Sequence, residues 1–281
     1  MFRDASKNAY TTPVVTHASP RRGQDPVCVT AQTLHVEGRC CFVTVGKALG
    51  RRVVALIRHG EYAQPTGVPS AHLPYGLTER GRQQAGDAAR SVLDFAGRSG
   101  LRLQPSVDCS RLRRAWETAT LLARGLTEQA GQQFSCQEFD DLAERSVGAV
   151  ANLSVEAIEA ILGEDPRYSV PPSGWKRDAD YRLPFQGCET LAEAGSRVAQ
   201  HLRSTVAMLD EETLKLLVGH GGAFRHAARE LGILSPTQVA SLSMGYGVPL
   251  YFEVERLQNG ADRFIHIAGD WRQRSSGGAI D

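Results

Sequence analysis

The 281-residue chain is predicted to be an α/β protein, a three-layer α/β/α sandwich with a mostly parallel central sheet. Three observations predict this class. A continuous apolar run, typical of a strand buried on both faces, occurs at residues 53–57, and residues 214–218 form a second, mainly apolar strand segment. Segments in which apolar residues recur at helical spacing separate the predicted strands, so helices should cover both faces of the sheet. The length and a hydrophobic content of 42% suffice for one large domain.

Residues 1–50 differ from the rest of the chain. Ser, Thr, Pro and Arg are scattered through them without sustained periodicity, which predicts a poorly ordered N-terminal extension. A short run at 40–45 is compatible with an edge strand. The Ser, Thr and Arg content resembles that of an organelle transit peptide, although Asp4 and Asp25 argue against one. The folded domain is therefore expected to span residues 51–281.

The first half of that domain should begin with a buried strand at 53–57. A helix at 78–95 follows, because a threonine suited to an N-cap precedes Glu79 and alanines recur along one face. A short strand at 107–109 and a helix at 112–126 come next. The segment 134–139 alternates and is predicted to be a strand.

The second half contains a Pro-rich segment between regular elements. A helix is predicted at 155–162, but residues 166–184 carry Trp, Tyr and several prolines in an irregular pattern. We expect an insertion at about 153–184 to act as a lid. The remaining predicted elements are a strongly patterned helix at 190–209, a strand at 214–218, a helix at 222–231 after a glycine turn, and strands at 249–254 and 264–268.

Charge and composition exclude several classes of partner. The formal net charge is +1, and the 32 basic and 31 acidic residues are interspersed, so neither nucleic acid nor a membrane surface is an expected partner. No apolar run approaches the roughly 20 residues of a membrane span, and the N-terminus lacks a signal-peptide core. Six irregularly spaced cysteines predict reduced thiols in a cytoplasmic protein.

Polar residues follow three of the predicted strands at the point where each strand ends. Arg58 and His59 follow the first strand, Ser110 to Arg114 follow the strand at 107–109, and His220 follows the strand at 214–218. Open α/β sheets bind ligands at the carboxyl ends of their strands. Two arginines and two histidines should therefore meet in one crevice, which by composition is a phosphate site.

Phosphoryl transfer explains why these residue types would be needed. The guanidinium forks of Arg58 and Arg114 can each hold two phosphate oxygens and stay charged at working pH. A neutral imidazole is a competent nucleophile near pH 7, so His59 is the candidate nucleophile. His220 is the candidate for stabilising the transition state, since Gly221 and Gly222 after it remove side-chain bulk and let it approach the phosphate closely.

The leaving alkoxide also needs a proton donor on a loop that leads toward the substrate. Glu144 is well placed, between the strand at 134–139 and the irregular segment. Asp140 and Asp141 are rivals that spacing alone does not exclude. Arg225 is assigned to an ordinary helix position, with support of the site as the alternative.

Several motifs together resemble the histidine phosphatase superfamily, which includes phosphoglycerate mutases. LIRHGE at 56–61 resembles the family signature, and VGHGGAFR at 218–225 its second histidine element. Between them, in family order, lie LTERGRQQA at 77–85, the SxLxRAxxTA pattern at 110–119, LxExxxG at 142–148 and a GGES-like segment with Cys188 in place of the second glycine. The resemblance implies a nucleophilic His59, a clamp of Arg58, Arg114 and His220, and Glu144 as proton donor in preference to the aspartates.

The departures from the mutase pattern favour hydrolysis. Mutases of this family usually place an asparagine and then a Gly-Trp stretch after RHGE, whereas Tyr62 to Pro65 follow it here. We therefore expect a metal-independent phosphomonoesterase, acting on a small phosphorylated metabolite through a phosphohistidine at His59. The alternatives are mutase-type transfer or a catalytically idle regulatory or binding module. No cofactor is expected, a homodimer is compatible with the sequence, and the spacing of Cys28, His35, Cys40 and Cys41 fits no common zinc module.

Overall fold

The computed structural model describes residues 32–36, 39–43, 50–69 and 71–274, and the chain divides into two units, 1–50 and 51–281. In the first unit, β1 (Gln32–Val36) pairs antiparallel with β2 (Arg39–Val43). Strand β2 overlaps the run at 40–45, whereas β1 was not predicted. Residues 44 and 45 lie outside the described residues. So do most of residues 1–50, and the poor order predicted for them stays a prediction.

The second unit is built on a six-stranded sheet in the order β5-β4-β6-β3-β8-β9. Its strands are β3 (Arg52–Arg58), β4 (Arg102–Ser110), β5 (Ser135–Phe139), β6 (Thr213–Gly219), β8 (Pro249–Arg256) and β9 (Asp262–Ala268). Strands β3 to β6 run parallel, and β8 and β9 run antiparallel at one edge. The predicted mostly parallel sheet is confirmed.

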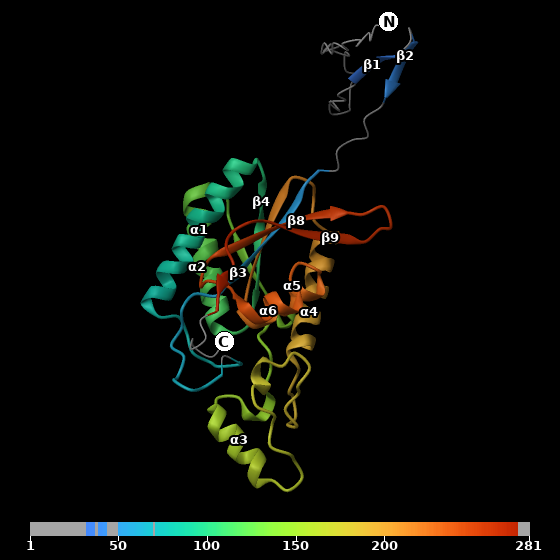
Figure 1. Cartoon of the computed structure of the whole chain (residues 1–281). Coiled ribbons are helices and arrows are strands. Elements are labelled where there is room, and N and C mark those ends of the chain that lie inside the picture. The colour runs from blue at the N-terminus through green and yellow to red at the C-terminus, as the bar shows by residue number, and fades with distance from the viewer. Residues whose placement is uncertain (1–31, 37–38, 44–49, 70, 275–281) are drawn as a thin grey trace, which may run out of the picture. The chain divides into compact units, whose positions relative to one another are not determined.

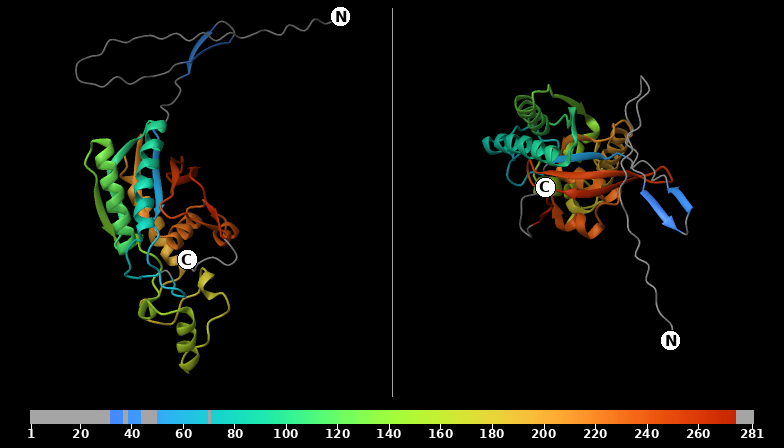
Figure 2. Two further views of the ribbon diagram at one scale, coloured as in Figure 1. Left: turned by 90° about the vertical axis from the view of Figure 1, so that its left-hand side faces the viewer. Right: turned by 90° about the horizontal axis from the view of Figure 1, so that it is seen from above.

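Helices cover both faces of this sheet, as Figure 1 and the turned views of Figure 2 show. The helices are α1 (Glu79–Ser99) and α2 (Arg113–Ala130) on one face and α4 (Leu191–Ala207) and α5 (Gly221–Glu230) on the other. Alternate residues of β3 enter two separate cores, with Val53 packed in the core of α1 and α2 and Val54 in that of α4 and α5. Burial on both faces explains the unbroken apolar run, and the three-layer architecture is confirmed.

Helix ends follow local capping chemistry. The Thr78 side chain accepts a hydrogen bond from the Gly81 backbone N–H at the start of α1, as its sequence position predicted. Gly100 adopts a left-handed conformation with φ of 67° and ends the helix. The predicted end at residue 95 was too early, because the last turn, up to Ser99, adds only Ala96 to the buried face.

The segment between β5 and α4 forms a small apolar core of its own. It contains η1 (Asp140–Leu142), η2 (Gly148–Val150), α3 (Val155–Glu164) and η3 (Trp175–Arg177). Ile158, Leu162 and Trp175 pack together there, and Ala71 joins them from the loop before α1. In Figure 1, α3 lies at the end of the unit farthest from the sheet. The expected irregularity of residues 166–184 is confirmed except for η3.

Three short elements near the C-terminus were not predicted. They are α6 (Pro236–Ser241), which begins with a capping box at Ser235, and the paired strands β7 (Leu242–Ser243) and β10 (Arg272–Gln273). They bring Arg274 back to the end of α6, as its backbone N–H bond to the Ser241 carbonyl shows. Across the described residues, no helix combines the length and apolar character needed to cross a bilayer.

Candidate active site

The predicted polar residues meet at the carboxyl ends of three neighbouring strands. Strand β6 lies between β4 and β3, and Val218 pairs with both Cys109 and Ile57. The residues that follow these positions therefore converge. The ring centroids of His59 and His220 are 5.1 Å apart, and both side chains are buried.

His59 is held in one tautomer. Its Nδ1 lies 2.7 Å from the carbonyl oxygen of Gly60, so Nδ1 carries the proton and donates it. Its Nε2 then keeps a lone pair and accepts a hydrogen bond from Arg114 Nε at 3.2 Å. Burial, followed by the charges of Arg114 and Arg58, lowers the pKa of His59 well below its usual value. The imidazole is therefore neutral, with Nε2 free to act as a nucleophile once a phosphorus atom replaces the arginine contact.

Glycine contacts hold the turn after β3 against α1. A Cβ on Gly60 would lie 2.4 Å from the carbonyl oxygen of Gly81, and a Cβ on Gly81 would lie 1.9 Å from that of Glu61. The Gly60 N–H also donates to the Thr118 hydroxyl at 3.0 Å. This close backbone packing explains why a glycine follows His59.

Arg114, in the first turn of α2, is fully buried. Besides its bond to His59, it donates from Nη1 to the carbonyl oxygen of Leu73 at 3.1 Å and from Nη2 to that of Ala71 at 2.7 Å. The outer edge of the guanidinium thus already faces two oxygen acceptors. Phosphate oxygens could take the places of these carbonyls.

Arg58 is the second arginine near the two histidines. Its Nη1 donates to the Met244 carbonyl at 3.1 Å, and its guanidinium carbon lies 4.0 Å from the centre of the Tyr246 ring. Gly221 packs on this side chain, because a Cβ there would be 3.2 Å from Arg58 Cδ and Nε. A larger residue at this position would press on the arginine, whereas the close approach to phosphate predicted for Gly221 stays a prediction.

His220 caps the N-terminus of α5 and is fully buried. Its Nε2 is 2.9 Å from the hydroxyl of Ser110 at the end of β4. Among the described residues, its Nδ1 has no hydrogen-bond partner. Burial first, and then the charge of Arg114, lowers its pKa well below the usual value. A buried nitrogen without a partner beside two arginines suits a phosphate oxygen.

Glu144 is buried against the N-terminus of α5. Its Oε1 accepts from the backbone N–H of Arg145 at 2.9 Å and of Ala223 at 3.0 Å, and its Oε2 accepts from Gly222 at 3.1 Å. A Cβ on Gly222 would lie 2.7 Å from Oε1, so the glycine leaves room for the carboxylate. Oε2 makes one contact fewer and is the oxygen better able to carry a proton.

The rival carboxylates lie elsewhere. Asp140 and Asp141 belong to η1 and are exposed, and Asp140 is 3.6 Å from the exposed Arg111. The structure therefore separates them from the two histidines. Burial distinguishes Glu144 from its neighbours, which spacing alone did not.

Arg225 departs from the expected ordinary helix position. It is 4% exposed and donates to the carbonyl oxygens of Gly221, Val239 and Leu242, thereby tying the first turn of α5 to α6 and β7. The alternative of support for the site describes it better. Its place in the GHGGAFR motif was the available signal.

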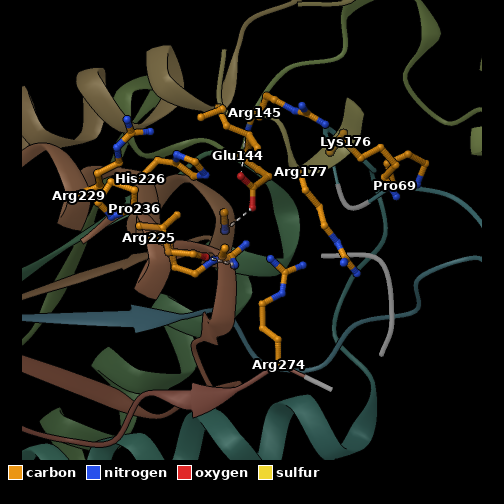
Figure 3. A pocket seen from close by; sticks show the side chains of 16 residues that line it. Pro69, Glu144, Arg145, Lys176, Arg177, Arg225, His226, Arg229, Pro236 and Arg274 are labelled. Atoms are coloured by element: carbon orange, nitrogen blue, oxygen red, sulfur yellow. Dashed lines mark hydrogen bonds between the residues drawn. The ribbon is translucent and has the colours of Figure 1, made fainter. Parts of the chain in front are cut away.

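A cavity of about 210 Å³ adjoins Glu144. Six cationic side chains line it, and Figure 3 shows Arg274 extending from the C-terminal segment toward Glu144. The cationic residues are Arg145, Lys176, Arg177, Arg225, Arg229 and Arg274, and His226 is also in the lining. The sequence did not single out this group, because its members come from four separate segments.

In the part of the chain that the structure describes, no three His, Cys, Asp or Glu side chains are grouped so as to hold a metal ion. The side chains of Cys28, His35, Cys40 and Cys41 lie outside the described residues. Cys109, Cys136 and Cys188 are free thiols.

Curated relatives match most of the chain. The 2,3-bisphosphoglycerate-dependent phosphoglycerate mutase of Parvibaculum lavamentivorans is 26% identical over 207 residues, covering 72% of this chain and 90% of that protein. The mutase of the same name from Brucella ovis is 28% identical over 206 residues, covering 72% and 92%. The chain therefore spans nearly the full length of these relatives.

Solved structures share the fold. A mycobacterial glucosyl-3-phosphoglycerate phosphatase aligns with a TM-score of 0.55 at 23% identity, covering 79% of this chain and 97% of that chain. The alpha-ribazole phosphatase from Shigella flexneri aligns with a TM-score of 0.55 at 21% identity, covering 76% and 94%.

The family assignment rests on a match of a family model to most of the chain. The model of the histidine phosphatase superfamily (branch 1) matches residues 54–256, which run from β3 to the end of β8. This range contains Arg58, His59, Arg114, Glu144 and His220, and it confirms the resemblance predicted from the motifs. The chain belongs to the histidine phosphatase superfamily.

Proposed function

We propose that the protein is a metal-independent phosphomonoesterase that acts on a small phosphorylated metabolite through a phosphohistidine at His59. The observation that carries the proposal is the state of His59, a neutral imidazole with its protonated Nδ1 on the Gly60 carbonyl and its Nε2 against Arg114. That arrangement presents a lone pair at the place where two arginines can hold a phosphate.

In the first step, His59 Nε2 attacks the phosphorus of the ester. The N–P bond forms as the bond from phosphorus to the ester oxygen breaks, and Glu144 Oε2 gives its proton to the departing alkoxide. Arg58, Arg114 and His220 neutralise the charge on the phosphate oxygens that take no part in bond exchange.

In the second step, water attacks the phosphorus of the phosphohistidine. Glu144, now a carboxylate, takes a proton from the water, the P–N bond breaks, and its electron pair returns to His59 Nε2. Inorganic phosphate leaves, and both residues regain their starting states. No metal ion is needed, because guanidiniums supply the positive charge.

When a substrate binds, Arg114 must also exchange its present hydrogen-bond acceptors for phosphate oxygens. In the structure, carbonyl oxygens of Ala71 and Leu73 occupy its outer edge. Phosphate oxygens would replace them, so the loop that carries Ala71 and Leu73 moves when the substrate binds. His59 is 1% exposed, which agrees with a site that opens to admit its ligand.

Mutase-type transfer is the second candidate, supported by the names of the curated relatives. Hydrolysis is favoured because Tyr62 follows the first motif, and its ring meets His59 edge-on at 5.2 Å. An idle binding module is disfavoured because such a module has no physical need to keep buried arginines facing two histidines. Reduced thiols and a metabolite substrate agree with a cytoplasmic enzyme.

The test is the release of phosphate from p-nitrophenyl phosphate and from alkyl phosphates. His59→Ala should abolish turnover of both, with an unchanged circular dichroism spectrum. Glu144→Gln should slow alkyl esters far more than the aryl ester, because only the alkoxide needs the proton. Equal losses on both would contradict the acid role.

With 3-phosphoglycerate, release of phosphate would support hydrolysis, and appearance of 2-phosphoglycerate would establish a mutase.

A further inference from the structure

We propose that Tyr246 is a positioning residue for Arg58, and that its ring fixes the guanidinium in the orientation that binds the phosphate of the substrate. The inference rests on the proposed function, in which Arg58 holds phosphate oxygens, and adds a residue to it. Tyr246 lies in the loop between β7 and β8, beyond the last of the sequence motifs, which ends at residue 225.

The Tyr246 ring lies against both the cation and the nucleophile. The guanidinium carbon of Arg58 is 4.0 Å from the centre of the ring, well within the range of a cation–π contact. The ring centroid of His59 is 5.6 Å from that of Tyr246, and the two ring planes are inclined by 43°. One aromatic side chain therefore contacts the group that would hold the phosphate and the group that would attack it.

Arg58 is also contacted from α5. A Cβ on Gly221 would lie 3.2 Å from Arg58 Cδ and Nε, so the backbone at Gly221 packs closely on the side chain. A guanidinium donates its hydrogen bonds in its own plane, whereas an aromatic ring stacks on its face. The Tyr246 ring can therefore restrict the orientation of the guanidinium and still leave its donating edge to a phosphate.

The loop that carries Tyr246 is itself fixed to Arg58. Arg58 Nη1 donates to the Met244 carbonyl oxygen at 3.1 Å, and the Gly247 backbone N–H donates to the Arg58 carbonyl oxygen at 2.9 Å. Gly247 has a φ of 68°, and a Cβ there would lie 2.8 Å from the Gln84 carbonyl oxygen, so this position requires glycine. Backbone contacts on both sides of Tyr246 thus hold its ring over the arginine.

Exposure and charge separate this role from ordinary packing. Tyr246 is half-buried, whereas Arg58 is 2% exposed and His59 is 1% exposed. A partly exposed ring in a loop contributes less to the core than a buried one, so its loss should affect the arginine more than the fold. A neutral ring also leaves the positive charge of the guanidinium to the phosphate, which a carboxylate partner would offset.

The experiment measures the binding of inorganic phosphate by calorimetry, together with ester hydrolysis. Tyr246→Leu should weaken phosphate binding about 2- to 30-fold, the span of cation–π contacts from exposed to desolvated sites. Tyr246→Phe keeps the ring and should stay within about twofold of the wild type. In Tyr246→Leu, kcat/KM should fall by a similar factor on aryl and alkyl phosphates, because Tyr246 transfers no proton. A much larger loss on alkyl phosphates would place its effect on the proton donor and overturn the proposal.

A double-mutant cycle tests whether Tyr246 acts through Arg58. Arg58→Gln alone should lower phosphate affinity and kcat/KM. Adding Tyr246→Leu to Arg58→Gln should change both by less than about twofold, because the group that the ring positions is gone. A further loss as large as the one in the wild-type background would show that the two residues act independently, and it would overturn the proposal.

Phe95→Leu is the matched control for the loss of an aromatic ring. The Phe95 ring stacks on Tyr251 in the core of α1 and α2, with centroids 3.7 Å apart. This variant should lower the midpoint of urea unfolding and leave phosphate affinity unchanged. If affinity falls with stability in both leucine variants, Tyr246 has a structural role alone, and the proposal is overturned.

Calorimetry with phosphate also separates this inference from the proposed function. If no ester is hydrolysed, the proposed function fails, whereas phosphate affinity that is lost in Tyr246→Leu and kept in Tyr246→Phe would still support the inference. Unchanged affinity in Tyr246→Leu, or no phosphate binding by the wild type, would overturn it. Should Tyr246→Leu not fold, Tyr246→Gln, with a polar side chain suited to a half-buried loop position, replaces it with the same expected loss.

Discussion

Replacing Gly222 with alanine should remove proton donation with little effect on the fold. A Cβ at this position would lie 2.7 Å from Glu144 Oε1, 3.0 Å from Oε2 and 3.1 Å from Cδ, whereas ordinary contact begins at 3.4 Å. The carboxylate must therefore retreat by about 0.7 Å from its place on the α5 N-terminus. The retreat would break or lengthen its bonds to the Gly222 and Ala223 N–H groups.

The magnitude follows from the proton-donor role proposed for Glu144. General acid catalysis contributes roughly 10²- to 10⁴-fold, and a displacement of about 1 Å in a catalytic group can cost about 10²-fold. We expect Gly222→Ala to lower kcat about 10- to 100-fold on alkyl phosphates and less than about threefold on p-nitrophenyl phosphate. Stability should change little, because alanine has the better helix propensity and the atoms that must shift lie at the end of a side chain.

The assay measures kcat for a series of esters of falling leaving-group pKa, together with the midpoint of urea unfolding. Gly86→Ala is the matched control, since it adds a methyl group to a helical glycine with no atom within 4 Å. It should raise stability by about 0.5–1 kcal/mol and leave kcat unchanged. Equal kcat losses across the series, or no loss for Gly222→Ala, would refute the reasoning.

Three further predictions concern stability, pH and metals. Asp108→Ala should lower the free energy of urea unfolding by about 3–5 kcal/mol, because it leaves the buried Lys215 ammonium, now 2.6 Å from the Asp108 carboxylate, without a counter-charge. Adding Lys215→Met should restore most of this loss. Burial, and then the charge of Arg225, lowers the pKa of His226 to about 4. On acidification, the unfolded chain therefore takes up a proton at this histidine at a higher pH than the folded chain does. The unfolding free energy should thus fall by up to about 3 kcal/mol between pH 6.5 and 4 relative to His226→Gln, and a gain on acidification would contradict this. Phosphatase activity should survive a chelator, and a loss that added Mg²⁺ reverses would point to a metal enzyme.

The sheet was predictable where burial alone sets the pattern. Strands β3 and β6 are covered on both faces, and their sequences are accordingly mainly apolar, with Lys215 as the exception inside β6. Strand β4 was underestimated, because its first half is partly exposed, includes Pro105, and shifts register between Leu103 and Val107. Lys215 lies in the middle of β6, where Asp108 on the neighbouring strand compensates its charge. Such compensation depends on tertiary pairing and has no local sequence signal.

The cluster of histidines and arginines was more predictable than the cavity beside Glu144. His59 and His220 each follow a recognisable strand, and parallel strands place their carboxyl ends at one edge of the sheet. The cationic residues that line the cavity have no such rule. His226 is an ordinary helix residue by its pattern, and Arg274 lies beyond the last strand, so only the packing of α5 against the C-terminal segment brings them together.

The most direct test of the account is to map the phosphoryl group on the enzyme during turnover. The protein would be mixed with a ³²P-labelled ester, quenched rapidly in alkaline denaturant and digested, and the labelled peptide identified. Our account predicts an acid-labile, base-stable phosphoryl group on the peptide that contains His59, formed and lost at rates no slower than turnover. Steady release of phosphate while His59 stays unlabelled at every quench time would contradict it.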